Sequence, residues 1–253
     1  MPGQAAPAEL GQAGNLLYGT AQSWSSQAQK DEEAWLCRLF PEAFACGCLL
    51  LFAAPLVKAV HLASDPLVAH WVGNMPKIGV ALSLSMVFAG YAMHKAWGRP
   101  SKCAVMLSLL GSSVVLGALA NYLSITSIEL GDKFIASDCA SFPAKFVLER
   151  EWKEARDFRS ACRSYMGSDA YVVQDCPGYD LASPRHASWE FLKTLESTYA
   201  CAGWCSEQAP LWTLGKTEDS CSFVSGFVMT AKIHPNANQV LVYCAVVLAM
   251  AVL

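Results

Sequence analysis

The amino-acid sequence predicts an all-α membrane protein with four transmembrane helices and a mostly helical, disulfide-stapled extracytosolic domain between spans three and four. Hydrophobic residues make up 54% of the chain and charged residues 15%, against about 25% charged residues in an ordinary soluble domain. Of the 39 charged residues, 26 lie between Ile128 and Pro235. Six of the eleven cysteines lie in that same block, and an even cysteine set is typical of an oxidising compartment.

The six cysteines of the polar block predict three disulfides. A domain of this size buries a limited core, and each disulfide adds a few kcal/mol of stability. Six cysteines allow 15 connectivities, and their spacing does not choose among them. The disulfide candidates are Cys139, Cys162, Cys176, Cys201, Cys205 and Cys221.

Residues 1–40 are expected to form an N-terminal arm that is largely irregular or lies on the membrane surface. The arm is rich in Gly, Ala, Gln and Ser, and its first basic residue is Lys30. It lacks the charged start of a cleavable signal peptide and the arginines of a transit peptide. The first span is therefore expected to serve as an uncleaved signal anchor.

Residues 41–130 carry the first three predicted transmembrane helices, and residues 236–253 carry the fourth. The apolar runs are Ala43 to Ala63, Ile78 to Ala96, Cys103 to Leu130 and Val240 to Leu253. A span needs about 20 residues to cross a hydrocarbon core of about 30 Å. Because the last run is too short for this, we expect further chain beyond Leu253 to complete it.

Basic residues near the spans predict the orientation. The link between spans two and three holds Lys95, Arg99 and Lys102 and no acidic residue. Loops of this kind remain in the cytosol. The 131–235 domain then lies on the opposite, oxidising side, where disulfides persist.

The 131–235 domain is expected to be mostly helical. A helix over Lys145 to Met166 is predicted to place Leu148, Trp152, Ala155, Cys162 and Tyr165 near one face. A second helix is predicted to begin at Ser183-Pro184 and to end near Gly203. A third follows Cys221 and leads toward the last span.

These features together resemble a tetraspanin. The chain has a short first outer link, a short basic inner link and a large cysteine-bearing outer loop before the last span. Tetraspanins carry Cys-Cys-Gly at the end of a helix in this loop. Here Cys201 and Gly203 hold the first and third places, Ala202 replaces the middle cysteine, and Cys205 follows two residues later. Cys221 resembles the last cysteine of the family's loop.

No catalytic pattern is found, and we expect that the chain is not an enzyme. Cys201 and Cys205 are spaced C-x3-C, unlike the C-x-x-C of thiol oxidoreductases. Hydrolase, metalloprotease and phosphate-loop motifs are absent from the sequence. We also expect no metal, no cofactor and no small-molecule substrate. Nucleic acid is not expected as a partner, because the net charge is only -3 and no basic cluster with aromatics occurs.

Two functions fit these features. In the first, the resemblance implies an integral membrane scaffold of the plasma membrane or endomembranes, which organises other integral membrane proteins and membrane lipids through its outer loop and spans. In the second, the chain is an accessory subunit of a photosystem or respiratory supercomplex in a thylakoid or inner mitochondrial membrane. Chlorophyll or carotenoid would then be the cofactor, with His61, His70 and His94 as pigment ligands.

Four further cysteines lie near the predicted cytosolic ends of the spans. They are candidate sites of S-palmitoylation, which adds membrane affinity. An unmodified cysteine behaves as a small apolar side chain, and this alternative stays open. The four residues are Cys37, Cys46, Cys48 and Cys103.

Overall fold

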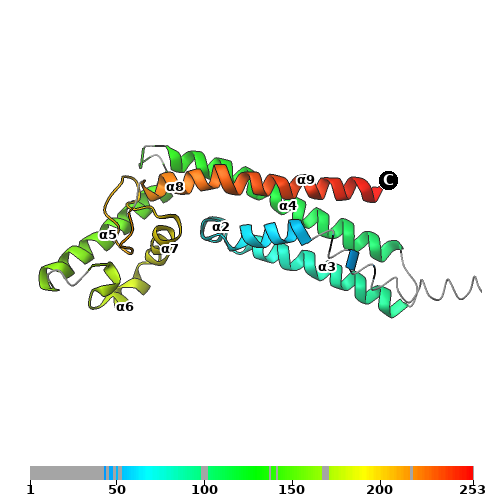
Figure 1. Cartoon of the computed structure of the whole chain (residues 1–253), viewed down its shortest axis with the longest axis horizontal. Coiled ribbons are helices and arrows are strands. Elements are labelled where there is room, and N and C mark those ends of the chain that lie inside the picture. Colours follow the sequence, from blue (N-terminus) through cyan, green and yellow to red (C-terminus); the bar gives the residue numbers. More distant parts are fainter. Residues whose placement is uncertain are drawn as a thin grey trace, which may run out of the picture.

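A computed structural model describes residues 53–97, 102–136, 138–140, 142–166, 171–216 and 219–252, together with residues 43, 46, 47 and 50. Every regular element in this part of the chain is a helix, so the all-α prediction is confirmed. The long helices form an elongated bundle, and α5, α6 and α7 gather at the end away from the carboxyl terminus (Figure 1).

The bundle contains α3 (Met75–Trp97), α4 (Lys102–Ile135), α9 (His234–Val252) and a helix that includes residues 53–64, named here the 53–64 helix. Helix α4 packs along both α3 and α9 (Figure 1). Its 34 residues span about 51 Å at 1.5 Å per residue. That length exceeds a hydrocarbon core of about 30 Å, so one end of α4 reaches into the 131–235 domain.

Two helical stretches of the described residues are long and apolar enough to cross a membrane. They are Met75–Met93 and Leu107–Ile135, and only 22% and 39% of their apolar windows are buried inside the molecule. The predicted first span is described only in part, and the fourth apolar run lies in α9 as far as Val252. Four spans therefore remain a prediction.

The link between the 53–64 helix and α3 folds into a short helix, α2 (Pro66–Trp71). Asp65 begins α2, because its carboxylate accepts a hydrogen bond of 3.0 Å from the backbone N–H of Leu67 and Pro66 occupies the first helical position. Helix α2 packs against α7 (Trp189–Tyr199) of the 131–235 domain. The first link and the domain therefore lie at the same end of the bundle.

Helix α9 continues directly from the domain without a loop. Helix α8 (Cys221–Val228) passes through a π-helical segment (Met229–Ile233) into α9. Pro235 has no backbone N–H to donate to the carbonyl of the preceding turn, and widening of the helix before it relieves this mismatch. The predicted third helix of the domain and the predicted fourth span are thus one continuous helix.

Helices α4 and α8 cross in near backbone contact. A Cβ placed on Gly226 would lie 2.7 Å from the carbonyl oxygen of Gly131, and a Cβ on Gly131 would lie 2.5 Å from Cγ2 of Thr230. Only glycine fits at both positions. The crossing fixes the domain end of α4 against the start of the last helix.

The 131–235 domain, called the outer domain below, contains α5 (Pro143–Met166), a 3-10 turn (Val173–Asp175), α6 (Tyr179–Ala182), a second 3-10 turn (Ser183–Arg185) and α7. The predicted start of the second helix is wrong. Ser183 and Pro184 form the 3-10 turn, and the chain leaves helical geometry at His186, where φ is -113° and ψ is 85°. Helix α7 begins only at Trp189 and ends at Tyr199, because Ala200 is left-handed.

The core of the outer domain contains many aromatic side chains. It also includes residues near the beginning and near the end of the polar block that runs from Ile128 to Pro235. Leu148, Trp152 and Ala155 of α5 are buried, as the periodicity predicts. Tyr165 is 90% exposed, so its predicted place on the buried face is wrong. The remainder of the domain packs on the first part of α5, and the last two turns have little to pack against.

Lys145 ties the beginning of α5 to the end of α4. Its side chain is buried, and its ammonium group donates hydrogen bonds to the carbonyls of Phe134, at 2.9 Å, and Ala136. Helix ends leave their last carbonyls without partners, and a cation there satisfies them. Burial lowers the pKa of Lys145, and the charge of Asp138 opposes this effect.

Candidate functional site

Three disulfides join all six cysteines of the outer domain. They pair Cys139 with Cys205, Cys162 with Cys176 and Cys201 with Cys221. The first fastens the α4–α5 link to the loop after α7. The second ties the end of α5 to the loop before α6, and the third ties the end of α7 to the beginning of α8. Each disulfide therefore links two different segments of the domain.

The disulfides are expected to differ in their contribution to stability. Cys139–Cys205 closes 66 residues and Cys162–Cys176 closes 14, so chain entropy predicts losses of about 4 and about 3 kcal/mol on their removal. Denaturation of the double serine variants under non-reducing conditions measures both values. A larger loss from the shorter loop would contradict the entropic ranking.

The loop after α7 is organised by a buried carboxylate. Glu196 is 2% exposed. Its oxygens accept hydrogen bonds from the backbone N–H groups of Leu211, Trp212 and Thr213 at 3.1, 2.8 and 2.7 Å, and from the Thr213 hydroxyl at 3.1 Å. Burial raises the pKa of Glu196, and the three backbone hydrogen bonds oppose that rise. The helical pattern of the sequence shows Glu196 only as one more position of α7, without a sign of this role.

An apolar face lies at the far end of α5, and we name it the distal face. Phe158, Ala161, Cys162, Tyr165, Met166 and Pro177 line a groove of about 320 Å³. The side chain of Tyr165 stands almost free of the fold at 90% exposure. Exposed apolar surface of this kind marks sites of association with other proteins or with membranes.

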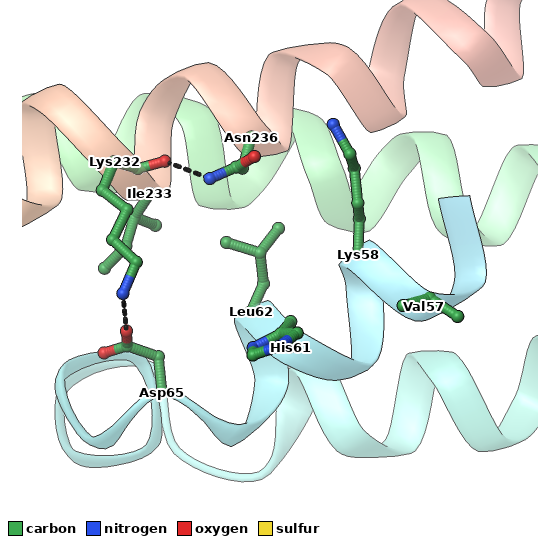
Figure 2. Close-up of a pocket in the computed structure, with 8 residues that line it drawn as sticks. All are labelled: Val57, Lys58, His61, Leu62, Asp65, Lys232, Ile233 and Asn236. Atoms are coloured by element: carbon green, nitrogen blue, oxygen red, sulfur yellow. Dashed lines mark hydrogen bonds and ion pairs between the residues drawn. The ribbon is translucent and has the colours of Figure 1, made fainter. Parts of the chain in front are cut away.

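A second cavity lies where the outer domain meets the bundle, and we name it the junction pocket (Figure 2). Its volume is about 270 Å³. The 53–64 helix forms one wall, and the π-helical segment and the start of α9 form the other (Figure 2). Its lining residues are Val57, Lys58, His61, Leu62, Asp65, Lys232, Ile233 and Asn236.

The single carboxylate of the junction pocket is already engaged. Asp65 accepts a hydrogen bond of 2.8 Å from the Tyr199 hydroxyl and forms an ion pair of 3.8 Å with Lys232. Its side chain is only 9% exposed. Burial and the neighbouring Asp65 charge raise the pKa of Tyr199 above its usual range, so this phenol remains a hydrogen-bond donor.

Two of the three histidines proposed as pigment ligands have described side chains, and these lie in different surroundings. His61 lines the junction pocket. His70 stacks on Phe191 with ring centroids 3.6 Å apart, and burial lowers its pKa. The side chain of His94 lies outside the described residues.

Of the palmitoylation candidates, only Cys46 has a described side chain, and it is exposed. Cys37, Cys48 and the side chain of Cys103 lie outside the described part of the chain. The exposure of Cys46 leaves its thiol accessible, and the modification remains a prediction.

Glu151, Glu154 and His186 form a cluster on the outer domain. Nδ1 of His186 lies 3.2 Å from a carboxylate oxygen of each glutamate, and one atom of each residue suits a metal ligand. The His186 ring also stacks on Trp189, with centroids 4.2 Å apart. The cluster fastens the segment before α7 to the solvent side of α5, which accounts for these contacts without an ion.

Comparisons with protein-family models, with curated proteins and with solved structures find no match.

Proposed function

We propose that this chain is a tetraspanin-like integral membrane scaffold, which organises other integral membrane proteins through the distal face of its outer domain. Apolar helices cross the bilayer in this proposal, and the outer domain lies on the oxidising side. The exposed distal face is the single observation that carries it. This face lies at the end of α5, at the start of the loop region from Cys162 to Cys221, which we propose as the partner-binding part of the outer domain.

Two features support association with other proteins. The Cys162–Cys176 disulfide fixes the distal face in one shape, which lowers the entropy that binding would cost. Tyr165 and Met166 are side chains of the kind enriched at interfaces between proteins. Tyrosine in particular is frequent among the residues that dominate binding energy.

The partner is expected to be the extracytosolic part of another membrane protein. Helix α5 extends beyond the packed core of the outer domain, so the distal face stands well away from the bundle (Figure 1). A partner with its own span in the same bilayer can reach this height from the side. A test of the distal face needs a small change. Exchange of the whole 163–200 segment would also remove Trp189 and Glu196 from the core of the domain.

The test is the double variant Tyr165→Ser and Met166→Ser, purified in mild detergent from its native membrane. We expect co-purified membrane proteins to fall at least about tenfold, because loss of interface anchors costs more than 1 kcal/mol. Phe146→Ser is the matched control, since Phe146 is an exposed aromatic residue (54%) at the other end of the same helix. An unchanged set of membrane partners in the double variant would contradict the proposal and favour a subunit held through its spans.

A further inference from the structure

We propose that the junction pocket binds the phosphate of an anionic membrane lipid, with the acyl chains lying against the bundle. This inference concerns a different surface from the distal face, and it rests on the proposed function only for the orientation of the chain in the membrane.

The charge of the junction pocket favours an anion. Lys58 and Lys232 are cationic, and His61 adds an exposed imidazole. Lys58 donates to the uncharged side-chain oxygen of Gln239, so its charge is not neutralised by that contact. Asp65 is the pocket's one acid, and its carboxylate is shared among Lys232, Tyr199 and the backbone of Leu67. An arriving phosphate would therefore meet two ammonium groups and one engaged carboxylate.

The two lysines come from opposite walls of the pocket. Lys58 rises from the 53–64 helix, and Lys232 reaches down from the π-helical segment toward Asp65 (Figure 2). The Lys232 side chain is 62% exposed and its contact with Asp65 is long, at 3.8 Å, so it can turn toward a ligand at low cost. Asn236, which also lines the pocket, donates its amide to the Lys232 carbonyl at 2.8 Å and holds that wall in place.

The position of the pocket relative to the membrane favours a lipid over a soluble phosphate. The polar start of α9 ends at Gln239, and its apolar run begins at Val240. Lys58 bonds to Gln239, so the pocket lies at the level where headgroups meet hydrocarbon in the proposed orientation. Val57, Leu62 and Ile233 give it apolar walls. A cationic rim above apolar walls matches a phosphate attached to acyl chains.

The experiment measures phosphatidylglycerol binding to the full chain in detergent by native mass spectrometry, with phosphatidylcholine as the zwitterionic comparison. We expect tighter binding of phosphatidylglycerol. The double variant Lys58→Gln and Lys232→Gln is expected to weaken it on the order of tenfold, because each lysine near a membrane surface contributes about 1 kcal/mol. Glutamine keeps a hydrogen-bonding group toward Gln239, and an unchanged melting temperature without lipid verifies the fold.

Lys77→Gln is the matched control, because Lys77 is exposed in the first turn of α3, at the same end of the bundle but outside the pocket. We expect this variant to bind phosphatidylglycerol within about twofold of the unaltered chain, a change within about 0.4 kcal/mol. Equal weakening by Lys77→Gln would mean a diffuse surface effect and overturn the site. Unchanged binding by the double variant, or equal affinity for both lipids, would also overturn it.

Competition with inorganic phosphate distinguishes a pocket that binds the phosphate of a lipid from one that binds free phosphate. We expect millimolar phosphate to leave phosphatidylglycerol bound, because free phosphate gains nothing from the apolar walls. Displacement of the lipid by phosphate at that concentration would show that the pocket binds the soluble anion, and would overturn the lipid assignment.

Discussion

Glu196→Ala is expected to lower the free energy of unfolding of the outer domain by about 3 to 5 kcal/mol. The change leaves three backbone N–H groups and the Thr213 hydroxyl without the acceptor they share. Each unsatisfied buried donor costs about 1 to 3 kcal/mol. Chemical denaturation of the disulfide-bonded protein, followed by tryptophan fluorescence, measures the loss because Trp204 and Trp212 lie in this core.

Glu190→Ala is the control for this variant. Glu190 lies on the same helix, but its side chain is 69% exposed and forms an ion pair with Lys193. We expect a loss of less than about 1 kcal/mol, as is usual for exposed ion pairs. Similar losses for the two variants would show that Glu196 acts only through helix propensity and not as the acceptor that folds the loop.

Gly203→Ala is expected to destabilise the outer domain by more than about 3 kcal/mol. Gly203 has φ of +72°, and an added Cβ would lie 2.0 Å from the carbonyl oxygen of Ser206. The loop cannot move away easily, because Cys201 and Cys205 are both held in disulfides on either side. The N–H of Cys221 also donates to the Gly203 carbonyl at 2.8 Å. The same denaturation measurement tests the expectation.

Gly178→Ala is the control that separates the strain of a left-handed backbone from the steric clash of the added Cβ. Gly178 has a similar φ of +85°, but an added Cβ would meet nothing within 4 Å. We expect a loss of about 1 to 2 kcal/mol, the usual penalty for a left-handed non-glycine residue. If Gly203→Ala lowered the free energy of unfolding no more than Gly178→Ala, the crowding around Gly203 would not contribute to the loss of stability.

The sequence predicts features that arise from local periodicity and misses those that depend on distant neighbours. The buried side of α5 follows from apolar spacing, and Leu148 and Trp152 occupy it. Tyr165 has the same spacing, yet it is exposed, because none of the described elements covers this side of the helix end. Spacing along one helix cannot show where its packing partners stop.

The start of α7 and the disulfide pairing could not be predicted from the sequence, for a related reason. Ser183-Pro184 is a strong local start signal, but both residues lie in a 3-10 turn that ends at Arg185, before His186 leaves helical geometry. His186 is then held by contacts with Glu151 and Glu154 on α5, which no local pattern reveals. Cysteine spacing likewise leaves 15 pairings open, and only the packing of the domain's helices and loops brings the right sulfurs together.

The junction pocket shows the same limit for a candidate site. Lys58 and His61 were visible in the sequence as polar residues near the end of an apolar run. Lys232 lies more than 170 residues away, and the two lysines line one pocket only because the 53–64 helix and the last helix pack together. Lys145 and Glu196 are further cases, since each gains its role from the backbone groups that fold around it.

In the described part of the chain, the bundle and the outer domain share two unbroken helical paths, which couple the orientation of one to that of the other. Helix α4 and the continuous α8–α9 helix both run from the bundle into the domain, and the Gly131–Gly226 crossing fastens them together. In the proposed membrane arrangement, spans tilt to match the thickness of the surrounding bilayer. The outer domain would turn with them, so local membrane thickness would set the direction in which Tyr165 points.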